Sequence, residues 1–134
     1  MLPIVPKIRI SQAAGLLGVS DDTVRRWIDG GHLAASIDDA GRKVLDGAQL
    51  ASFARRQAAA VPDPSAVGRS ARNRFVGLVT DVQVEGLVAQ VELQCGPHRV
   101  VSLMTAEAAR ELALTEGSVA VAVVKATQVV VETP

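Results

Sequence analysis

Aromatic residues are scarce in this chain of 134 residues, which contains one Trp, two Phe and no Tyr. This scarcity disfavours a protein that binds single-stranded nucleic acid on a platform of stacked aromatic rings. Cysteine occurs once, as Cys95, so an internal disulfide and a cysteine-rich zinc site are both excluded. The 14 basic and 14 acidic side chains cancel, which excludes a highly basic chromatin-type protein and an acidic tail protein.

Long apolar runs are also missing. The N-terminal segment 1–10 has no apolar stretch of signal-peptide length, and the longest apolar run near the end, 119–124, is far too short to span a bilayer. We therefore expect a cytoplasmic protein with no membrane partner and with Cys95 reduced. Hydrophobic residues nevertheless make up 49% of the chain and charged residues 21%, so it should fold.

A segment with proline and glycine divides the chain in two. Residues 58–69 contain Pro62, Pro64 and Gly68 and no sustained periodicity. This pattern predicts a linker between a unit at 1–57 and a unit at 70–134. The pattern is helical before the linker and strand-like after it. Up to residue 60 there are eight basic and six acidic residues, and after it the numbers are reversed, so the weak positive charge lies in the first half.

The first unit is predicted to contain short helices and one hairpin. The expected elements are helices beginning at Ser11 and Ser20, strands at 34–37 and 43–45, and a third helix that follows Asp46 and ends near Arg56. Gly18 allows a sharp turn between the first two helices. A helix, a tight glycine turn and a second helix with a polar leading face are typical of a helix-turn-helix.

The residues of this unit also carry a family resemblance. Residues 10–33, ISQAAGLLGVSDDTVRRWIDGGHL, resemble the winged helix-turn-helix of MerR-type and excisionase-like proteins, and the resemblance extends over about 8–56. It implies that the second helix enters the major groove of duplex DNA and that the hairpin is a wing on the phosphates. It places Trp27 in the core, and it implies DNA contacts by Ser20, Asp22, Thr23, Arg25 and Arg26 in the groove and by Arg42 and Lys43 in the wing.

Four acidic residues lie where a DNA-binding surface is expected to be positively charged. They are Asp21, Asp22, Asp38 and Asp39, which lie on the second helix and in the hairpin turn. Because neutralisation of phosphates supplies most of the nonspecific affinity for DNA, these carboxylates should lower it.

The second unit alternates between apolar and polar residues. In 87–94 the apolar side chains fall on every second position, which predicts a strand. Further strands are expected at 75–84, 99–104, 119–124 and 127–132, with a helix at 106–112 capped by Thr105. Five strands with one short helix between the third and fourth match the order of an OB-like barrel. The fold class is thus α+β with two domains, an N-terminal winged helix-turn-helix and a C-terminal all-β OB-like barrel with one short helix.

Two short motifs make the second unit resemble a known family. Ser70-Ala71-Arg72-Asn73 and Lys125-Ala126-Thr127 stand at the spacing of a molbindin or TOBE-type domain, and the resemblance runs from about 70 to 132. Such barrels exchange strands and bind molybdate or tungstate where subunits meet, which implies a homo-oligomer, either a dimer or a hexamer. The implied oxyanion-binding residues are Ser70, Ala71, Arg72, Thr105, Lys125 and Ala126.

The chemistry of these residues suits a tetrahedral dianion. A guanidinium, an ammonium and hydroxyls donate hydrogen bonds to it, and backbone N–H groups at Ala71 and after Thr105 can complete the shell. No metal ligand is required of the protein, because molybdate or tungstate is bound as an oxyanion. Ala108 stands where the family has a serine ligand, and the missing hydrogen bond costs about 1–3 kcal/mol. Ser102 or a water molecule is the alternative donor.

Three functions remain open at this point. The first is a transcriptional regulator that responds to molybdate or tungstate. The second is a storage or homeostasis protein for the same anions, with the N-terminal unit used for assembly, and the third is an architectural DNA-binding protein whose barrel only oligomerises. DNA binding separates the first from the second, and oxyanion binding separates the first from the third. No enzyme is expected, because no nucleophile elbow, zinc-protease motif or Walker loop is present.

Overall fold

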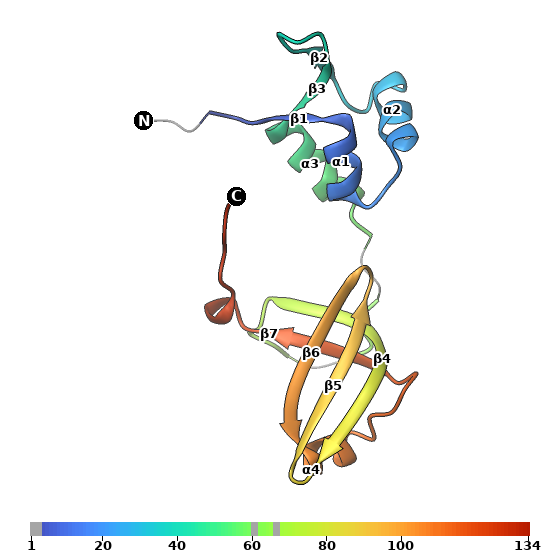
Figure 1. Ribbon diagram of the computed structural model, residues 1–134, viewed down its shortest axis with the longest axis vertical. Coiled ribbons are helices and arrows are strands. Elements are labelled where there is room, and N and C mark those ends of the chain that lie inside the picture. Colours follow the sequence, from blue (N-terminus) through green and yellow to red (C-terminus); the bar gives the residue numbers. More distant parts are fainter. Residues whose placement is uncertain (1–3, 60–61, 66–67) are drawn as a thin grey trace. The chain divides into compact units, whose positions relative to one another are not determined.

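The computed structural model describes residues 4–59, 62–65 and 68–134, and the chain divides into two compact units, Met1–Ala60 and Val61–Pro134 (Figure 1). Part of the expected linker, residues 60, 61, 66 and 67, lies outside the described residues. The first unit contains β1 (Lys7–Arg9), α1 (Ile10–Leu17), α2 (Asp21–Asp29), β2 (Ala35–Ile37), β3 (Lys43–Asp46) and α3 (Gly47–Gln57). None of the described helices is long and apolar enough to cross a membrane.

The turn between α1 and α2 forms as the sequence predicts. Gly18 ends α1 in the left-handed region at φ 68°, and its N–H donates to carbonyl oxygens of the last helical turn. Ser20 caps α2, since its hydroxyl accepts a hydrogen bond from the Thr23 N–H at 3.1 Å. The expected cap at Ser11 is wrong, because α1 begins at Ile10 directly after β1 and Arg9 makes no side-chain cap bond. Burial of Ile10, rather than capping, places the start of α1.

The wing is an antiparallel hairpin completed by a third strand. β2 and β3 are the two expected strands, and β1, which the sequence did not predict, pairs with the other edge of β3. At the tip, one carboxylate oxygen of Asp38 accepts hydrogen bonds from the N–H groups of Ala40 and Arg42 at 2.9 and 2.8 Å. The Asp38 side chain therefore shapes the turn of the wing.

The core of the first unit joins the helices to the wing. Val24 of α2 and Leu45 of β3 are fully buried, and Phe53 of α3 is 3% exposed. Trp27 packs edge-on against Phe53, with ring centroids 4.8 Å apart. Trp27 is partly buried and packs against the core, and this contact helps to fix the orientation of α2.

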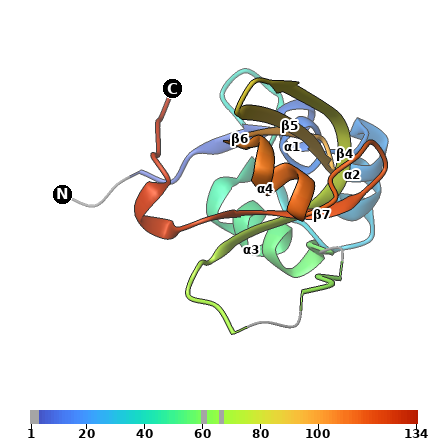
Figure 2. The same cartoon turned by 90° about the horizontal axis from the view of Figure 1, so that it is seen from below.

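The second unit is one curled, antiparallel sheet. It contains β4 (Asn73–Glu85), β5 (Val88–Cys95), β6 (His98–Thr105), α4 (Ala106–Glu111), β7 (Val119–Val124) and the 3-10 helix η1 (Ala126–Gln128). The strand order is β6-β5-β4-β7, and Figure 2 looks along the curl from the end where α4 lies. Alternate residues of β5 are buried, as the period of two predicts, and they form the core with Val79. The expected OB-like barrel with one short helix is confirmed as a curled half-barrel.

The fifth expected strand, 127–132, is wrong. The chain forms η1 at Ala126–Gln128 and then has no regular structure, and Val129, Val130 and Val131 are 48%, 83% and 82% exposed. Three β-branched residues favour an extended chain, but a strand also needs a neighbour to pair with. Within the described part of one copy, no strand pairs with this segment.

β4 bends so that the sheet can curl. The register against β5 shifts between Val79 and Asp81, which marks a bulge. Upstream, Gly77 lies so close to β5 that a Cβ there would be 2.5 Å from the Gln94 carbonyl oxygen and 2.6 Å from the Cys95 sulfur. Only glycine fits at this approach of two strands.

Candidate functional site

The polar face of α2 is a connected set of hydrogen bonds. The hydroxyls of Ser20 and Thr23 are 3.0 Å apart, and Arg26 Nη2 donates to Thr23 Oγ1 at 3.1 Å. These groups belong to the N-cap and the first two turns of the helix, and they are hydrogen-bonded to one another at the surface, whereas Val24 of the same helix is buried. The structure thus brings three of the predicted DNA contacts together on one exposed surface.

Arg25 and Asp22 form an ion pair on the same helix. Arg25 Nη1 lies 3.3 Å from Asp22 Oδ1, and the two side chains are 55% and 87% exposed. An exposed pair of this kind contributes about 0.2–1 kcal/mol, so Arg25 can leave it at little cost to meet another acceptor. Until then Asp22 is held by Arg25, which reduces the repulsion that its charge would exert on a phosphate.

The two basic residues of the wing differ in whether an acidic side chain already pairs with them. Arg42 Nε lies 3.4 Å from Asp38 Oδ2, and the hydrogen bond from the Arg42 N–H lowers the pKa of the Asp38 carboxyl. Lys43 is exposed and, in the part of the chain that the structure describes, makes no ion pair. Lys43 is therefore the wing residue best placed to meet a phosphate.

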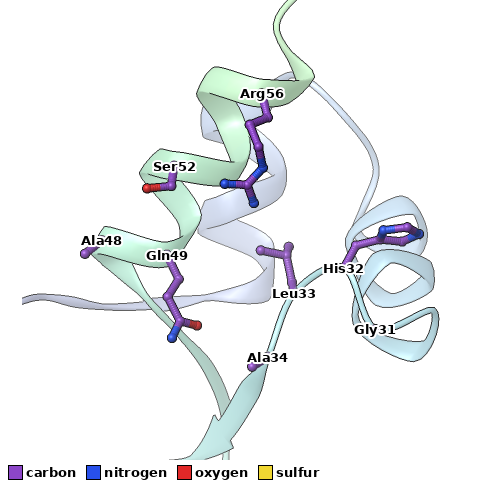
Figure 3. A pocket seen from close by; sticks show the side chains of 8 residues that line it. All are labelled: Gly31, His32, Leu33, Ala34, Ala48, Gln49, Ser52 and Arg56. Atoms are coloured by element: carbon purple, nitrogen blue, oxygen red, sulfur yellow. The ribbon is translucent and has the colours of Figure 1, made fainter.

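A polar hollow of about 460 Å³ lies beside α2. The segment Gly31–Ala34 forms one wall and α3 the other, and Figure 3 shows Gln49, Ser52 and Arg56 along that helix. No acidic residue lines the hollow. Its polar side chains can all donate hydrogen bonds, which suits an anionic group, and the sequence patterns did not point to it.

The two oxyanion motifs meet at one end of the curled sheet. Asn73 pairs with Val124 across β4 and β7, and Asn73 Nδ2 donates to the Val124 carbonyl oxygen at 3.1 Å. Ser70-Ala71-Arg72 directly precedes this pair, and Lys125-Ala126 directly follows it. Ser70, Arg72 and Lys125 are exposed, whereas Ala71 is buried. The topology thus brings together residues that are more than fifty positions apart.

Thr105 is not part of this group in a single copy. It pairs with Val88, which pairs with Glu85 at the far end of β4 from Asn73. β4 is 13 residues long, so the two ends are separated by roughly 40 Å of strand at about 3.3 Å per residue. Figure 1 shows α4, which follows Thr105, at one end of the sheet and η1 away from it. The predicted oxyanion residues therefore form two separate groups.

Some of the hydrogen-bonding groups around Thr105 already form hydrogen bonds within the chain. Thr105 Oγ1 accepts from the Ala108 N–H at 3.0 Å, and the Ala106 N–H donates to the Leu87 carbonyl oxygen at 2.8 Å. The helix start therefore offers fewer free N–H groups than expected. The Thr105 hydroxyl keeps its own proton, which it can donate to an anion.

Ser102 does not replace the missing hydroxyl at Ala108. Along β6, Ser102 and Thr105 are three residues apart, so their side chains point to opposite faces of the sheet. Ser102 lines an apolar hollow of about 550 Å³ on the inner face. Of the two alternative donors, only a water molecule is compatible with this arrangement in one copy.

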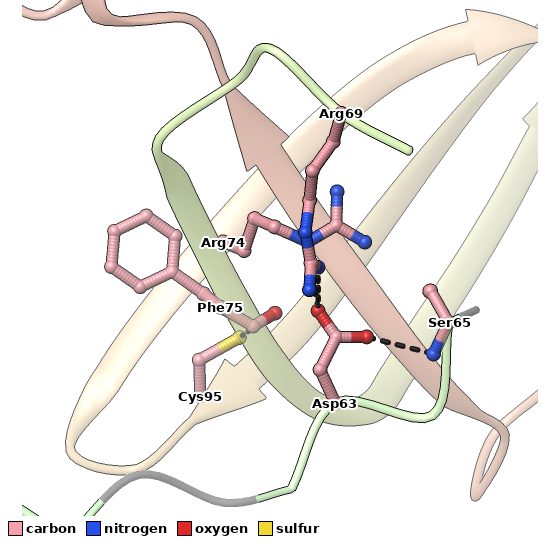
Figure 4. A network of polar contacts seen from close by, with 6 residues as sticks. All are labelled: Asp63, Ser65, Arg69, Arg74, Phe75 and Cys95. Atoms are coloured by element: carbon pink, nitrogen blue, oxygen red, sulfur yellow. Dashed lines mark hydrogen bonds and ion pairs between the residues drawn. The ribbon is translucent and has the colours of Figure 1, made fainter. Parts of the chain in front are cut away.

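One polar cluster was missed at the level of sequence. Asp63 Oδ2 accepts from Arg69 Nη1 at 2.6 Å and from Arg74 Nε at 2.7 Å, and Oδ1 accepts from the Ser65 N–H at 2.8 Å (Figure 4). The signal available was Pro62-Asp63-Pro64-Ser65, in which aspartate favours a turn closed by its own side chain. The sequence patterns predict only a linker at this position.

Comparison with known proteins assigns both units. A family model for a helix-turn-helix domain matches residues 8–58, and one for a TOBE domain matches residues 69–131. The chain joins a helix-turn-helix domain to a TOBE domain. Among curated proteins there is no match.

Three solved structures are similar to parts of this chain. They are MopII from Clostridium pasteurianum (31% identity, TM-score 0.46), a molybdate-binding protein from Sporomusa ovata (24%, 0.48) and the cytoplasmic molybdate-binding protein ModG (37%, 0.45). They cover 49%, 50% and 48% of this chain, and 100%, 100% and 46% of their own chains. Because all TM-scores are below 0.5, the assignment rests on the family models.

Proposed function

We propose that this protein is a non-catalytic transcriptional regulator whose helix-turn-helix domain binds duplex DNA and whose TOBE domain binds molybdate or tungstate. The observation that carries the proposal is the pairing of Asn73 with Val124, which places Arg72 and Lys125 at the same end of the sheet. Both are exposed and, among the described residues, neither forms an ion pair. Two such cations with nearby hydroxyl and N–H donors suit a tetrahedral dianion.

The separation of Thr105 from this group supports a site shared between copies. A single copy offers the two cations at one end of β4 and Thr105 at the other, so one anion contacts both groups only when two copies meet. The exposed segment 129–131 and the edge strands β6 and β7, whose outer edges no described strand of the same copy pairs with, offer surfaces on which copies can join. A homodimer is the smallest assembly with such a site, and a hexamer is the larger one that the family resemblance implies.

Calorimetric titration tests the anion site. We expect the purified protein to bind molybdate or tungstate at one anion per chain and not to bind sulfate. Light scattering on the same sample should give at least twice the 14.0 kDa of one chain. A 14 kDa monomer that binds the anion with full affinity would contradict the shared site, and heat signals equal to those with sulfate would contradict the ligand.

Two substitutions test the DNA surface. Arg25→Ala should weaken operator binding by about 1–3 kcal/mol, since a bidentate contact to a base edge has that value. Lys43→Ala should weaken binding to all sequences alike and reduce the salt dependence by about one phosphate contact. Electrophoretic mobility shifts with the protein's own upstream region at several salt concentrations measure both. Absence of any shift at low salt would remove the DNA-binding assignment.

A further inference from the structure

The cluster around Asp63 ties the chain between the two domains to the TOBE domain. Arg74 belongs to β4, whereas Asp63 and Arg69 precede that strand. The side chain of Asp63 is 19% exposed, that of Arg74 14% and that of Arg69 37%. Figure 4 shows both guanidinium groups converging on the one carboxylate.

This cluster is stronger than an ordinary surface ion pair. Both carboxylate oxygens are used, one by two cations and the other by a backbone N–H. Charge-assisted hydrogen bonds of this length are about twice as strong as neutral ones, and partial burial reduces screening by salt. The hydrogen bond from Arg74 holds the pKa of Asp63 well below its ordinary value, so the carboxylate stays charged. In the sequence, Asp63 is the only acid between Asp46 and Asp81.

The position of Asp63 determines how much chain is left between anchored points. On the helix-turn-helix side, the last anchored residue is Ala58, whose N–H donates to the Ala54 carbonyl oxygen. With Asp63 bound, the four residues 59–62 separate the two anchored points, and four residues of any conformation span at most about 14 Å. With Asp63 released, the next anchored residue is Ala71, which is buried, and the twelve residues 59–70 can span at most about 43 Å.

We propose that Asp63 is a latch that fastens the interdomain chain to β4 and so limits how far the helix-turn-helix domain moves from the TOBE domain. The latch uses Arg69 and Arg74, which stand on either side of Ser70-Ala71-Arg72. It therefore also holds the segment that carries the first oxyanion motif. The proposal does not depend on DNA or anion binding, because the contacts that form the latch are made within one chain.

Trypsin reports directly on the latch, because it cleaves after a free arginine and Arg69 is held by Asp63. In the full-length protein, Asp63→Asn should speed cleavage after Arg69 about tenfold or more, since cleavage follows the population of the open form and a charge-assisted hydrogen bond is lost. Cleavage after Arg56 of α3 is the internal reference. Asp81→Asn, which removes the same charge from β4, is the matched control and should leave both rates unchanged.

Small-angle X-ray scattering measures the radius of gyration, which increases when the helix-turn-helix domain moves farther from the TOBE domain. Asp63→Asn should give a larger radius of gyration than wild type, with circular dichroism unchanged, and Asp81→Asn should not. If Asp63→Asn were to lose its circular dichroism signal, Arg74→Gln, which removes the contact between Asp63 and β4, serves for the measurement of the radius of gyration. A wild-type cleavage rate after Arg69 in folded Asp63→Asn, or a wild-type radius of gyration in Arg74→Gln, would overturn the latch. A larger cleavage rate with an unchanged radius of gyration would overturn its control of reach.

Discussion

Saturating molybdate is expected to change the affinity of this protein for its operator about 5- to 150-fold at fixed salt, the usual range of coupling between two sites. A ligand shifts a DNA-binding equilibrium only through its different affinity for the two states. Ser70 and Arg72 lie directly after the chain that leads from the helix-turn-helix domain. Ordering them around an anion fixes where that chain leaves the sheet, and so changes the spacing of two DNA-reading domains. Binding curves with and without molybdate measure the effect.

Lys125→Ala should abolish this response and leave DNA binding without anion nearly unchanged. Lys125 lies in the TOBE domain, far along the sequence from α2 and the wing, and its ammonium would contribute a compact charge to the proposed anion site. Arg110→Ala is the matched control, because it removes one exposed cation from α4 of the same domain and should preserve the response. Equal operator affinity with and without anion, in protein that binds the anion, would favour storage or homeostasis. Operator binding in protein that binds no anion would favour an architectural role.

Gly77→Ala is expected to destabilise the TOBE domain by about 3 kcal/mol or more. The added Cβ would overlap the Gln94 carbonyl oxygen and the Cys95 sulfur, and the backbone of β5 cannot yield without breaking its pairing with β4. For a unit of this size the loss corresponds to a fall of about 10 °C or more in Tm.

Thermal unfolding followed by circular dichroism measures this effect. Gly68→Ala is the control in the same unit, since no atom lies within 4 Å of its added Cβ and its φ is not in the left-handed region. It should be neutral or slightly stabilising, because alanine lowers the entropy of the unfolded chain. A Tm of Gly77→Ala within about 2 °C of wild type would show that β4 and β5 separate easily.

The helix-turn-helix could be predicted from sequence because its signals are local. Gly18, Ser20 and Asp46 each act within four residues, through a left-handed turn or a side-chain cap. β1 could not be predicted, since three residues are too few to show a period, and pairing with β3 is what makes them a strand. The strand expected at 127–132 failed for the converse reason, because β propensity is present but the described residues of one copy offer it no partner strand.

The candidate anion site was predicted only in its residue types. Spacing within a family pointed to Ser70, Arg72 and Lys125, and the β4–β7 register explains why they lie together. The distance to Thr105 depends on the length and pairing of β4, which local patterns do not encode. Asp63 was missed because its two arginine partners are six and eleven residues away, beyond the range of a turn signal.

The length of β4 has a consequence for mixed assemblies. In a two-fold symmetric dimer with the proposed shared site, each copy would give its Lys125 end to one site and its Thr105 end to the other, so the two sites would be identical. A dimer of one Lys125→Ala subunit and one Thr105→Ala subunit then collects both defects in one site and leaves the other intact. We expect each variant alone to bind the anion weakly, because each then lacks one donor at both sites. Co-expression should restore one intact site in each mixed dimer, which anion titration of the mixed dimer measures.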